Sequence, residues 1–460
     1  MKVTIVGGGP GGYVAAIRAA QLGAEVSLIE KGKLGGVCLN EGCIPTKALL
    51  HAASLYAEVR EGARLGVMAE VRLDFAKTQE YKAGVVKRLV NGVSGLLAAS
   101  KVKVIQGEAS FAPGGRLTVQ GANGTTDAAF DKLILAAGSV PALPPIPGMG
   151  IPQCIDSSGA LALASVPASM LIIGGGVIGM EMASLYNALG SRIVVAEMLP
   201  DILPMLDGDI TRTLRTSLAG KGVEILTQAR VMEVKDQGTE ALALLEVGGE
   251  RKEFKVEKIL VAAGRCPNTA SLNLDAAGLA HERGRIRVNE RMETNLPGVY
   301  AIGDCNGQIM LAHAASAQGE IAAENALGHS ARFHPGTNPS CVYTSPECAG
   351  VGLTEEQAKT QGLDYITGTF PLSANGKSLI MNGGKGMIKI IAGRRHKEIL
   401  GAHLIGPRAT DLVAEAALAV GMEATIDEII GTIHAHPTVA EAFREAALAV
   451  DKRAIHTLNK

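Results

Sequence analysis

The feature that most constrains this chain is a pattern that occurs twice, once at the N-terminus and once near residue 170. In each copy a short apolar run leads into a glycine-rich loop, an Ala-rich stretch, and a second apolar run that ends in an acid. The loops are Gly7-x-Gly9-x-x-Gly12 and Gly174-x-Gly176-x-x-Gly179, and the acids are Glu30 and Glu197. The first glycine and the acid are 23 positions apart in both copies, because 30 − 7 and 197 − 174 are both 23. The duplication predicts two similar strand–helix–strand units.

Each part of the pattern has a chemical reason. A glycine-rich turn between a strand and a helix lets the backbone approach a pyrophosphate, and it points amide groups and the helix N-terminus at the negative charge. The acid at the end of the second strand then accepts hydrogen bonds from a ribose hydroxyl. One such loop is weak evidence, since glycine clusters are common in turns. Two complete copies predict two Rossmann-like nucleotide-binding domains.

Other segments indicate how the chain is divided. Residues 140–152 are rich in proline and can form neither a helix nor a central strand. Residues 298–304 have the character of a strand followed by a turn, and we expect them to return to the first unit. From about residue 338, strands such as 387–391 are followed by Ala-rich helices at 409–420 and 439–450. The predicted fold class is α/β, with two Rossmann-like nucleotide-binding domains and a C-terminal α+β domain. The predicted divisions are 1–143, 144–265, a central segment 266–337 that returns to the first domain, and 338–460.

Composition excludes several classes of function. The 44 basic and 45 acidic residues give a net charge of −1, which disfavours nucleic acid as a partner because that needs a concentrated positive field. No stretch of about 18 uninterrupted apolar residues is present, so no membrane span is expected. The first strand begins almost at Met1 and leaves no room for a secretory signal. We therefore expect a cytoplasmic protein with no membrane and no nucleic-acid partner.

Two of the seven cysteines are close together, Cys38 and Cys43. They follow the acid of the first unit, so their loop should lie beside whatever the first glycine loop binds. A zinc site would need two more ligands, and Cys341 with Cys348 is a poor candidate pair because of its spacing. No metal is expected. A redox disulfide beside a flavin needs one cysteine that exchanges with substrate and one that exchanges electrons with the flavin, and this pair supplies both.

Two further pairs of residues are candidates for the same site. Lys47 follows Cys43 by four positions and is interpreted either as a cation near a flavin, paired with Glu181, or as an exposed lysine on a helix. Thiol chemistry needs a base because the thiolate is the attacking species. His436 with Glu441 five residues later has the arrangement of a base and the acid that orients it. On the residues alone, His436 is equally well explained as a surface histidine near a helix start.

At this point the chain resembles a known family. Residues 35–47, Gly-Gly-Val-Cys-Leu-Asn-Glu-Gly-Cys-Ile-Pro-Thr-Lys, closely resemble the active-site motif of dihydrolipoamide dehydrogenases, a class of pyridine nucleotide disulfide oxidoreductases. Residues 434–438, His-Ala-His-Pro-Thr, with Glu441 resemble the C-terminal base motif of that family. The similarity extends over nearly the whole chain, including residues 11–23, 301–304 and 373–376.

The resemblance implies roles for individual residues. Cys38 would exchange with substrate, Cys43 would contact the flavin, and His436 with Glu441 would come from the other subunit of a homodimer formed by the C-terminal interface domain. The first domain would bind FAD and the second NAD. The residues implied at the FAD site, besides Gly7, Gly9, Gly12 and Glu30, are Lys47, Ala109, Ala137, Gly138, Ser139, Asp304, Met310, Leu311, Ala312 and His313. The residues implied at the NAD site, besides Gly174, Gly176, Gly179 and Glu197, are Val231 and Gly264. Glu181 is the candidate cofactor-site partner of Lys47.

The implied reaction oxidises protein-bound dihydrolipoamide through Cys38, Cys43 and FAD, and it reduces NAD. The partner would be a lipoyl-bearing carrier protein or the acyltransferase core of a 2-oxoacid dehydrogenase complex, or a glycine cleavage system. Three alternatives remain. Glutathione reductases usually carry basic residues after the second acid, where this chain has Met198-Leu199-Pro200, and mercuric reductases carry a C-terminal cysteine pair that this chain lacks. A flavin-binding subunit kept mainly for assembly is disfavoured by the intact cysteine and His–Glu pairs.

Overall fold

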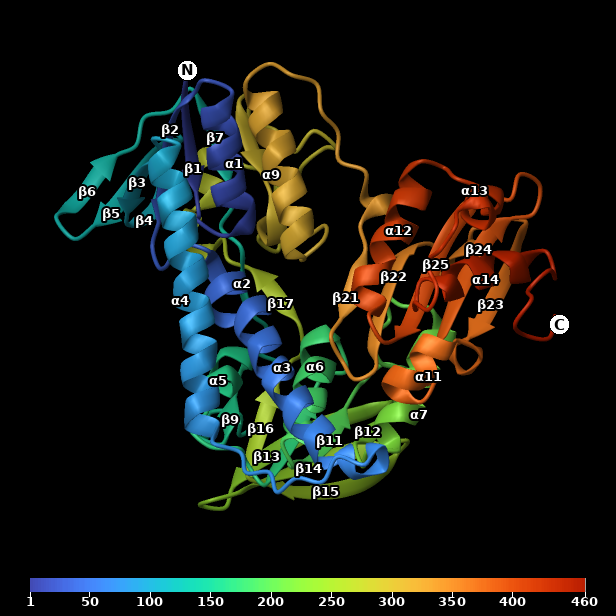
Figure 1. Ribbon diagram of the computed structural model, residues 1–460. Coiled ribbons are helices and arrows are strands. Elements are labelled where there is room, and N and C mark those ends of the chain that lie inside the picture. The colour runs from blue at the N-terminus through green and yellow to red at the C-terminus, as the bar shows by residue number, and fades with distance from the viewer. Residues whose placement is uncertain (460) are drawn as a thin grey trace.

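A computed structural model describes residues 1–459. Its first unit is a five-stranded parallel sheet in the order β20-β7-β1-β2-β3, with α1 and α9 side by side on one face (Figure 1). The apolar run before the first glycine loop forms the central strand, β1, and all but its first residue are buried. The elements of this unit are β1 (Lys2–Val6), α1 (Pro10–Gln21), β2 (Glu25–Glu30), α2 (Gly36–Glu41), α3 (Cys43–Arg60), α4 (Phe75–Ala99), β3 (Lys103–Gln106), β7 (Lys132–Leu135), β20 (Val299–Ala301) and α9 (Ala312–Ala326).

The second unit repeats this plan. Its sheet is also parallel, in the order β12-β11-β10-β16-β9, and β10 after the Pro-rich segment takes the central position of β1. The elements are β9 (Cys154–Ile155), α5 (Ser157–Leu161), β10 (Ser169–Ile173), α6 (Val177–Ala188), β11 (Arg192–Ala196), α7 (Gly208–Ala219), β12 (Glu224–Leu226) and β16 (Lys258–Val261). The duplication in the sequence is thus a duplication in the fold.

Both units carry a small antiparallel sheet before the strand that completes the βαβ repeat. These sheets are β4-β5-β6 in the first unit and β13-β14-β15 in the second. Their strands are β4 (Glu108–Ala112), β5 (Arg116–Gly121), β6 (Gly124–Asp127), β13 (Ala229–Asp236), β14 (Ala241–Val247) and β15 (Glu250–Val256). The crossing segments β8 (Ser139–Pro141) and β17 (Arg265–Pro267), which leave the two units in turn, pair with each other.

After the second unit the chain returns to the first. Strand β20 pairs with β7 in parallel, and α9 packs against α1, as expected for residues 298–304. The precise domain limits stay a prediction. The short elements of this return and of the connecting loops are η1 (Gly62–Leu65), η2 (Ala270–Leu272), α8 (Leu274–Ala277), β18 (His281–Glu282), β19 (Arg285–Ile286), η3 (Gly303–Asn306) and η4 (Pro335–Thr337).

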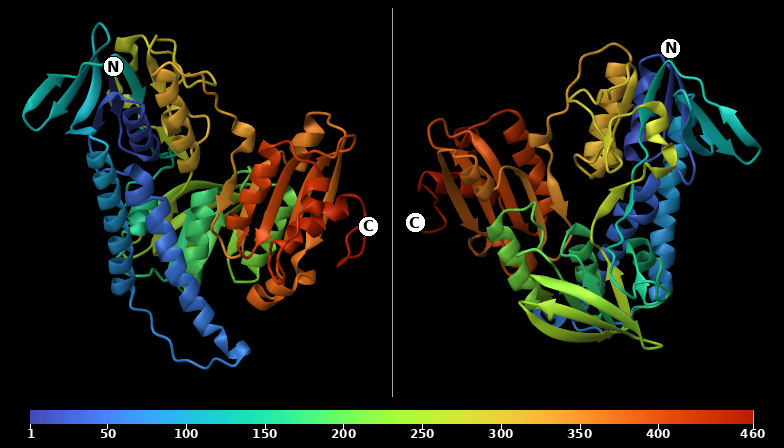
Figure 2. Two further views of the ribbon diagram at one scale, coloured as in Figure 1. Left: turned by 45° about the horizontal axis from the view of Figure 1, so that its top comes forward. Right: turned by 180° about the vertical axis from the view of Figure 1, so that it is seen from behind.

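The C-terminal domain is an antiparallel sheet in the order β21-β22-β25-β24-β23, with helices on one face (Figure 2). Its elements are β21 (Ser340–Val342), β22 (Glu347–Gly352), α10 (Glu355–Thr360), β23 (Tyr365–Pro371), η5 (Leu372–Ala374), α11 (Gly376–Asn382), β24 (Met387–Gly393), β25 (Ile399–Gly406), α12 (Ala409–Gly421), α13 (Ile426–Gly431) and α14 (Glu441–Val450). The predicted α/β fold class is confirmed. Helix α14 begins two residues later than predicted, because the amide of Thr438 donates to Glu441 Oε2 (2.8 Å) in an entry turn after Pro437.

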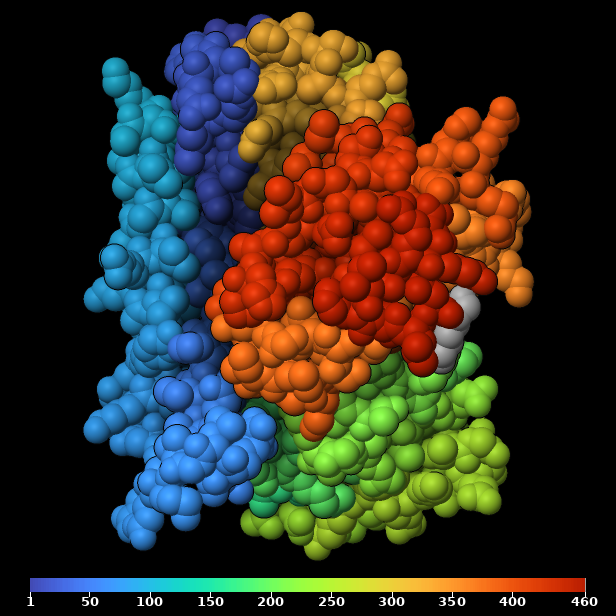
Figure 3. All heavy atoms as spheres, turned by 45° about the vertical axis from the view of Figure 1, so that its right-hand side comes forward, coloured from blue at the N-terminus to red at the C-terminus, as the bar shows by residue number. Residues whose placement is uncertain are grey.

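The three parts share one core. Val342, Cys348 and Ile405 of the C-terminal sheet are all fully buried and belong to the same hydrophobic cluster as the second unit and α3. Figure 3 shows the C-terminal domain in orange and red resting on the second unit in green. Helix α3 packs against both α4 and α6, so it connects the first unit to the second. Among residues 1–459, no helix combines the length and apolar character needed to cross a membrane.

Candidate active site

One large cavity, of about 2110 Å³, runs between the three parts of the molecule and is lined by both glycine loops. Most residues expected at a cofactor or redox site line it. These are Gly7, Gly9, Glu30, Cys38, Cys43, Lys47, Ala109, Ala137, Gly138, Ser139, Gly174, Gly176, Glu181, Glu197, Val231, Gly264, Asp304, Met310, Leu311, Ala312 and His313. The fold therefore brings together residues from all three parts of the sequence around one space.

Two of the expected glycines, Gly12 and Gly179, do not line the cavity. Each is the third glycine of its loop and lies inside the helix that follows. A Cβ on Gly12 would lie 1.8 Å from the carbonyl oxygen of Gly7, and a Cβ on Gly179 would lie 2.0 Å from that of Gly174. No side chain fits there, so these glycines permit the helix to pack closely on the strand. A Cβ on Gly176 would meet nothing within 4 Å, so the backbone at that end of the cavity is open to a ligand.

The two acids hold the glycine loops in the same way. Glu30 accepts from the amide of Gly8 (2.6 Å) and from the amide of Gly32 (2.6 Å). Glu197 accepts from the amide of Gly175 (2.5 Å) and from that of Leu199 (2.7 Å). Each carboxylate thus links the glycine loop of its own unit to the turn after the second strand of that unit. This repeated geometry, with glycine amides at a helix start, fits a dinucleotide in each unit.

The cysteine loop is a break between two helices. Cys38 lies in α2, and Cys43 is the first residue of the 18-residue helix α3. Gly42 between them has no helical geometry, with φ −140° and ψ −112°, and it ends α2. The first turn of α3 presents unpaired amides and the positive end of the helix dipole to Cys43, which favours a thiolate there.

The two thiols have opposite environments. A hydrogen bond from Cys38 lowers the pKa of Cys43 to about 7, and the Lys47 ammonium lowers it too, against the effects of burial and of Glu181. The same hydrogen bond raises the pKa of Cys38, and burial adds to that rise. The directions of the two shifts thus favour a thiolate on Cys43 over one on Cys38 in the reduced pair. In the part of the chain that the structure describes, no three His, Cys, Asp or Glu side chains lie together so as to hold a metal ion.

Lys47 is paired with Glu181, the first of the two interpretations given above. Its ammonium donates to both oxygens of Glu181, at 2.9 and 2.7 Å, and the Glu181 side chain is only 5% exposed. Lys47 lies one helical turn after Cys43 on α3, and Glu181 lies on α6 of the second unit. The pair therefore joins the two nucleotide-binding units directly beside the cysteines.

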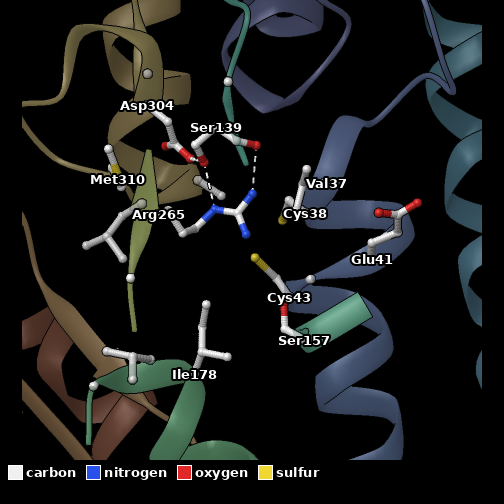
Figure 4. A pocket seen from close by; sticks show the side chains of 18 of the residues that line it. Val37, Cys38, Glu41, Cys43, Ser139, Ser157, Ile178, Arg265, Asp304 and Met310 are labelled. Atoms are coloured by element: carbon white, nitrogen blue, oxygen red, sulfur yellow. Dashed lines mark hydrogen bonds between the residues drawn. The ribbon is translucent and has the colours of Figure 1, made fainter. Parts of the chain in front are cut away.

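Two residues of this site were not expected from the sequence. Arg265, on β17, donates from Nε to Ser139 Oγ (2.6 Å) and from Nη2 to the Ser139 carbonyl (2.7 Å), and Ser139 Oγ in turn bonds to Asp304. Figure 4 shows its guanidinium pointing into the same space as the sulfurs of Cys38 and Cys43. Arg265 directly follows Gly264, which was assigned to the site, so its position in the sequence was the available signal. The second residue is Tyr343, whose ring faces Lys47 with the ammonium 4.5 Å from the ring centroid.

His436 and Glu441 form a pair but not within this cavity. His436 Nδ1 lies 2.8 Å from Glu441 Oε1, and the His436 side chain is 80% exposed. Burial alone would raise the pKa of Glu441, but the amide of Thr438 and the His436 ring lower it on balance. Neither residue is among the described residues that line the cavity of Cys38 and Cys43. Within one chain, the imidazole therefore faces outward, on the surface of the C-terminal domain.

Comparison with known proteins gives the family. Residues 1–319 match the pyridine nucleotide-disulphide oxidoreductase model, and residues 338–447 match the dimerisation domain of the same family. The chain is 44% identical over 461 residues to a dihydrolipoyl dehydrogenase of Thermus scotoductus, covering 99% of this chain and 98% of that protein. It is 41% identical over 462 residues to a dihydrolipoyl dehydrogenase of Geobacillus stearothermophilus, covering 100% and 98%.

Solved structures agree with this assignment. LpdA from Mycobacterium tuberculosis has a TM-score of 0.90 at 26% identity, covering 97% of this chain and 99% of that one. The HOCl-induced flavoprotein disulfide reductase RclA from Escherichia coli has a TM-score of 0.86 at 29% identity, covering 97% and 99%. The resemblance seen in the cysteine and histidine motifs is thus confirmed over the full length. The chain belongs to the pyridine nucleotide-disulphide oxidoreductase family.

Proposed function

We propose that this protein is a dihydrolipoyl dehydrogenase that oxidises a dihydrolipoyl group through a Cys38–Cys43 redox disulfide and passes the electrons through FAD to NAD. The observation that carries the proposal is the geometry of the cysteine pair. Cys38 and Cys43 line the cavity that both glycine loops share, and Cys43 is the first residue of α3, one turn before the Lys47–Glu181 ion pair. The charges agree with this geometry, because the hydrogen bond from Cys38 and the Lys47 ammonium lower the pKa of Cys43. The full-length similarity to dihydrolipoyl dehydrogenases supports the choice of substrate.

The dinucleotides are assigned by loop. FAD would be held at the first glycine loop by Glu30, residues 137–139, Asp304 and residues 310–313, which all line the cavity. NAD would be held at the second loop, where Glu197 would bind its ribose. A 2′-phosphate beside that carboxylate would be repelled, so NAD is preferred over NADP. When bound, FAD supplies a two-electron acceptor for Cys43 and a hydride donor to NAD.

The chain's own residues carry out the thiol exchange. A thiolate of dihydrolipoamide attacks the sulfur of Cys38, forms a mixed disulfide, and releases Cys43 as a thiolate. The second sulfur of the substrate then attacks the substrate sulfur that is bonded to Cys38. This closes the disulfide of lipoamide and releases Cys38 as a thiol. Lys47 stabilises the Cys43 thiolate by its charge.

The base for this exchange comes from a second copy of the chain. His436 takes the substrate proton, and Glu441 orients the ring and stabilises its positive charge. Because this pair is exposed and does not line its own chain's cavity, each site needs the C-terminal domain of the partner subunit. The match of residues 338–447 to a dimerisation domain supports this arrangement. The lipoyl group is brought by a separate carrier, such as the acyltransferase core of a 2-oxoacid dehydrogenase complex, and a cytoplasmic location stays a prediction.

The test is an anaerobic titration of the purified yellow protein with dihydrolipoamide, followed by NAD. We expect long-wavelength absorbance from a thiolate beside the flavin, and then formation of NADH. If dihydrolipoamide leaves the spectrum unchanged and NADPH with another disulfide produces the absorbance, the substrate assignment is wrong and the protein is a reductase of a different disulfide.

A matched pair of variants separates the redox cysteines from the others. We expect Cys38→Ser to abolish lipoamide turnover and to leave a yellow protein that still accepts hydride from NADH. Cys266→Ser is the control, because Cys266 is exposed and does not line the cavity. A colourless Cys38→Ser protein, or one with normal turnover, would contradict the role given to Cys38.

A further inference from the structure

Tyr343 contacts both members of the Lys47–Glu181 ion pair. Its backbone amide donates to Glu181 Oε1 at 3.1 Å. Its ring faces the Lys47 ammonium, which lies 4.5 Å from the ring centroid. The C-terminal domain therefore reaches across to hold an ion pair whose two members belong to the first and second units.

The backbone around Tyr343 is fixed on both sides. Val342, immediately before it, is fully buried in the core that the second unit shares with the C-terminal sheet. Two residues after it, the amide of Ser345 donates to Ser184 Oγ on α6 at 3.2 Å. The ring is thus carried on an anchored segment, and its position over Lys47 is not a chance contact of a free side chain.

The contact matters because Lys47 has freedom that Glu181 lacks. The Lys47 side chain is 30% exposed, whereas that of Glu181 is 5% exposed. Without the ring, the lysine stem could swing its ammonium into the cavity, away from the first turn of α3. A cation over an aromatic face is attracted to the ring even at a partly exposed site, and Tyr343 is 37% exposed. The ammonium of Lys47 is thus held by the Tyr343 ring as well as by the Glu181 carboxylate.

The charge of Lys47 acts directly on Cys43. Among the groups that act on the Cys43 sulfur, Lys47 is the cation that lowers its pKa, while Glu181 opposes that effect. The Arg265 guanidinium also points into this space, but its hydrogen bonds to Ser139 do not involve Tyr343. Burial raises the pKa of Cys341, the residue before Val342 on β21, but the Lys47 charge acts against that rise, so the ammonium lies close to this strand. The fraction of Cys43 that is thiolate thus depends on where the Lys47 ammonium lies between the Glu181 carboxylate and the Cys43 sulfur.

We propose that Tyr343 is a positioning residue of the redox site: its ring and its amide hold Lys47 against Glu181 at a fixed distance from Cys43, and so set how much of Cys43 is thiolate. The inference rests on the proposed function only in taking Cys43 as the redox cysteine that faces the flavin.

The experiment measures the Cys43 thiolate in the FAD-bound protein, without dihydrolipoamide or NAD. The reduced flavoprotein is alkylated with iodoacetamide over a range of pH, and Cys43 modification is followed by peptide mass spectrometry. We expect Tyr343→Leu to raise the pH midpoint by about 0.5 to 1 unit, because an ammonium that is no longer held in place loses part of its attraction for the Cys43 thiolate. Tyr343→Phe keeps the aromatic face and should keep the wild-type midpoint. Tyr81→Leu removes an exposed aromatic ring on α4 and serves as the control.

The outcomes are separable. If Tyr343→Leu retains FAD and the wild-type melting temperature but has the wild-type midpoint, the proposal is overturned. If Tyr343→Phe shifts as far as Tyr343→Leu, the hydroxyl and not the ring is responsible, and the proposal is also overturned. Should Tyr343→Leu fold poorly, Tyr343→Trp decides, because its stronger cation–π face should keep or lower the midpoint, and a raised midpoint counts against the proposal. A failed dihydrolipoamide titration leaves this readout untouched, so the two proposals fail independently.

Discussion

Lys389 is the residue whose loss we expect to cost the most stability outside the cavity. Its side chain is 3% exposed, and its ammonium bonds to Asp207 (2.9 Å), Asp209 (2.7 Å) and Glu355 (2.5 Å). Asp207 is fully buried and also accepts from the amides of Asp209 (3.1 Å) and Glu355 (3.0 Å). This cluster ties α7 of the second unit to β24 and α10 of the C-terminal domain.

The magnitude follows from burial. Replacing Lys389 with Met keeps the length of the side chain but leaves the Asp207 carboxylate, which is shielded from water, without its cation. Removing one partner of a buried ion pair costs about 3–5 kcal/mol, and the two amides that remain on Asp207 place the expected loss near the lower end of that range. Asp209 and Glu355 are about a third exposed, so water can solvate their carboxylates when Lys389 is lost. The expected loss of stability therefore comes from Asp207 alone.

The assay is thermal and urea unfolding of Lys389→Met beside wild type, with both proteins saturated in FAD and at equal protomer concentration. Arg116→Met is the matched control, because its ion pair with Asp127 is 65% and 64% exposed and should contribute no more than about 1 kcal/mol. If Lys389→Met and Arg116→Met lose the same small amount, Lys389 does not compensate the buried Asp207 and the reasoning is refuted.

The pH dependence gives a second check. Burial alone would raise the pKa of Asp207, but the amide of Glu355 and the Lys389 ammonium lower it on balance. A carboxyl with a lowered folded-state pKa contributes stability above its unfolded value, and that stability is lost as the pH falls through the folded value. The stability gap between wild type and Lys389→Met should therefore be widest near neutral pH and should shrink below about pH 4.

Three further predictions concern the site. Gly12→Ala should give little folded flavoprotein, because its Cβ would lie 1.8 Å from the carbonyl oxygen of Gly7, and the measurement is bound FAD per chain. His436→Gln should lower dithiol oxidation by on the order of 10²-fold without changing flavin reduction by NADH, and near-normal turnover would return His436 to a surface role. Co-expressed Cys38→Ser and His436→Gln chains should recover about a quarter of wild-type activity, since half of the dimers then hold one intact site; no recovery would argue against a shared site.

The sequence predicted what is encoded in short, contiguous patterns. The first glycine loop, its acid and the cysteine loop lie within about 40 residues of one another, and the second loop and its acid are equally close in sequence. Only glycine fits at positions such as 12 and 179, so few other folds are compatible with the pattern. The repeated order of strand, loop, helix and strand then specified parallel sheets, because a right-handed crossover gives that topology. The duplication was visible for the same reason, since both copies must meet the same backbone requirements.

The contacts that the sequence did not reveal join residues far apart in the chain. Lys389 and Asp207 are 182 residues apart, and Tyr343 and Glu181 are 162 apart. A lone lysine in a strand or a tyrosine after one has many possible partners, and neither local propensity nor periodicity selects among them. Lys47 illustrates the difference, because its pairing with Glu181 was one of two interpretations that only the packing of α3 on α6 could separate.

The position of His436 shows how much of this site lies beyond one chain. A His–Glu pair can be recognised from two residues five positions apart in the sequence, and the structure forms that pair at 2.8 Å. The same structure leaves the imidazole exposed and outside the cavity of Cys38, so the proposed base and the thiol it would serve cannot meet within one copy. Under the proposed mechanism, the geometry of the site then depends on the dimer. Changes on the exposed face of the C-terminal domain should therefore reduce turnover through the position of His436, even where FAD binding and the Cys43 thiolate are unaffected.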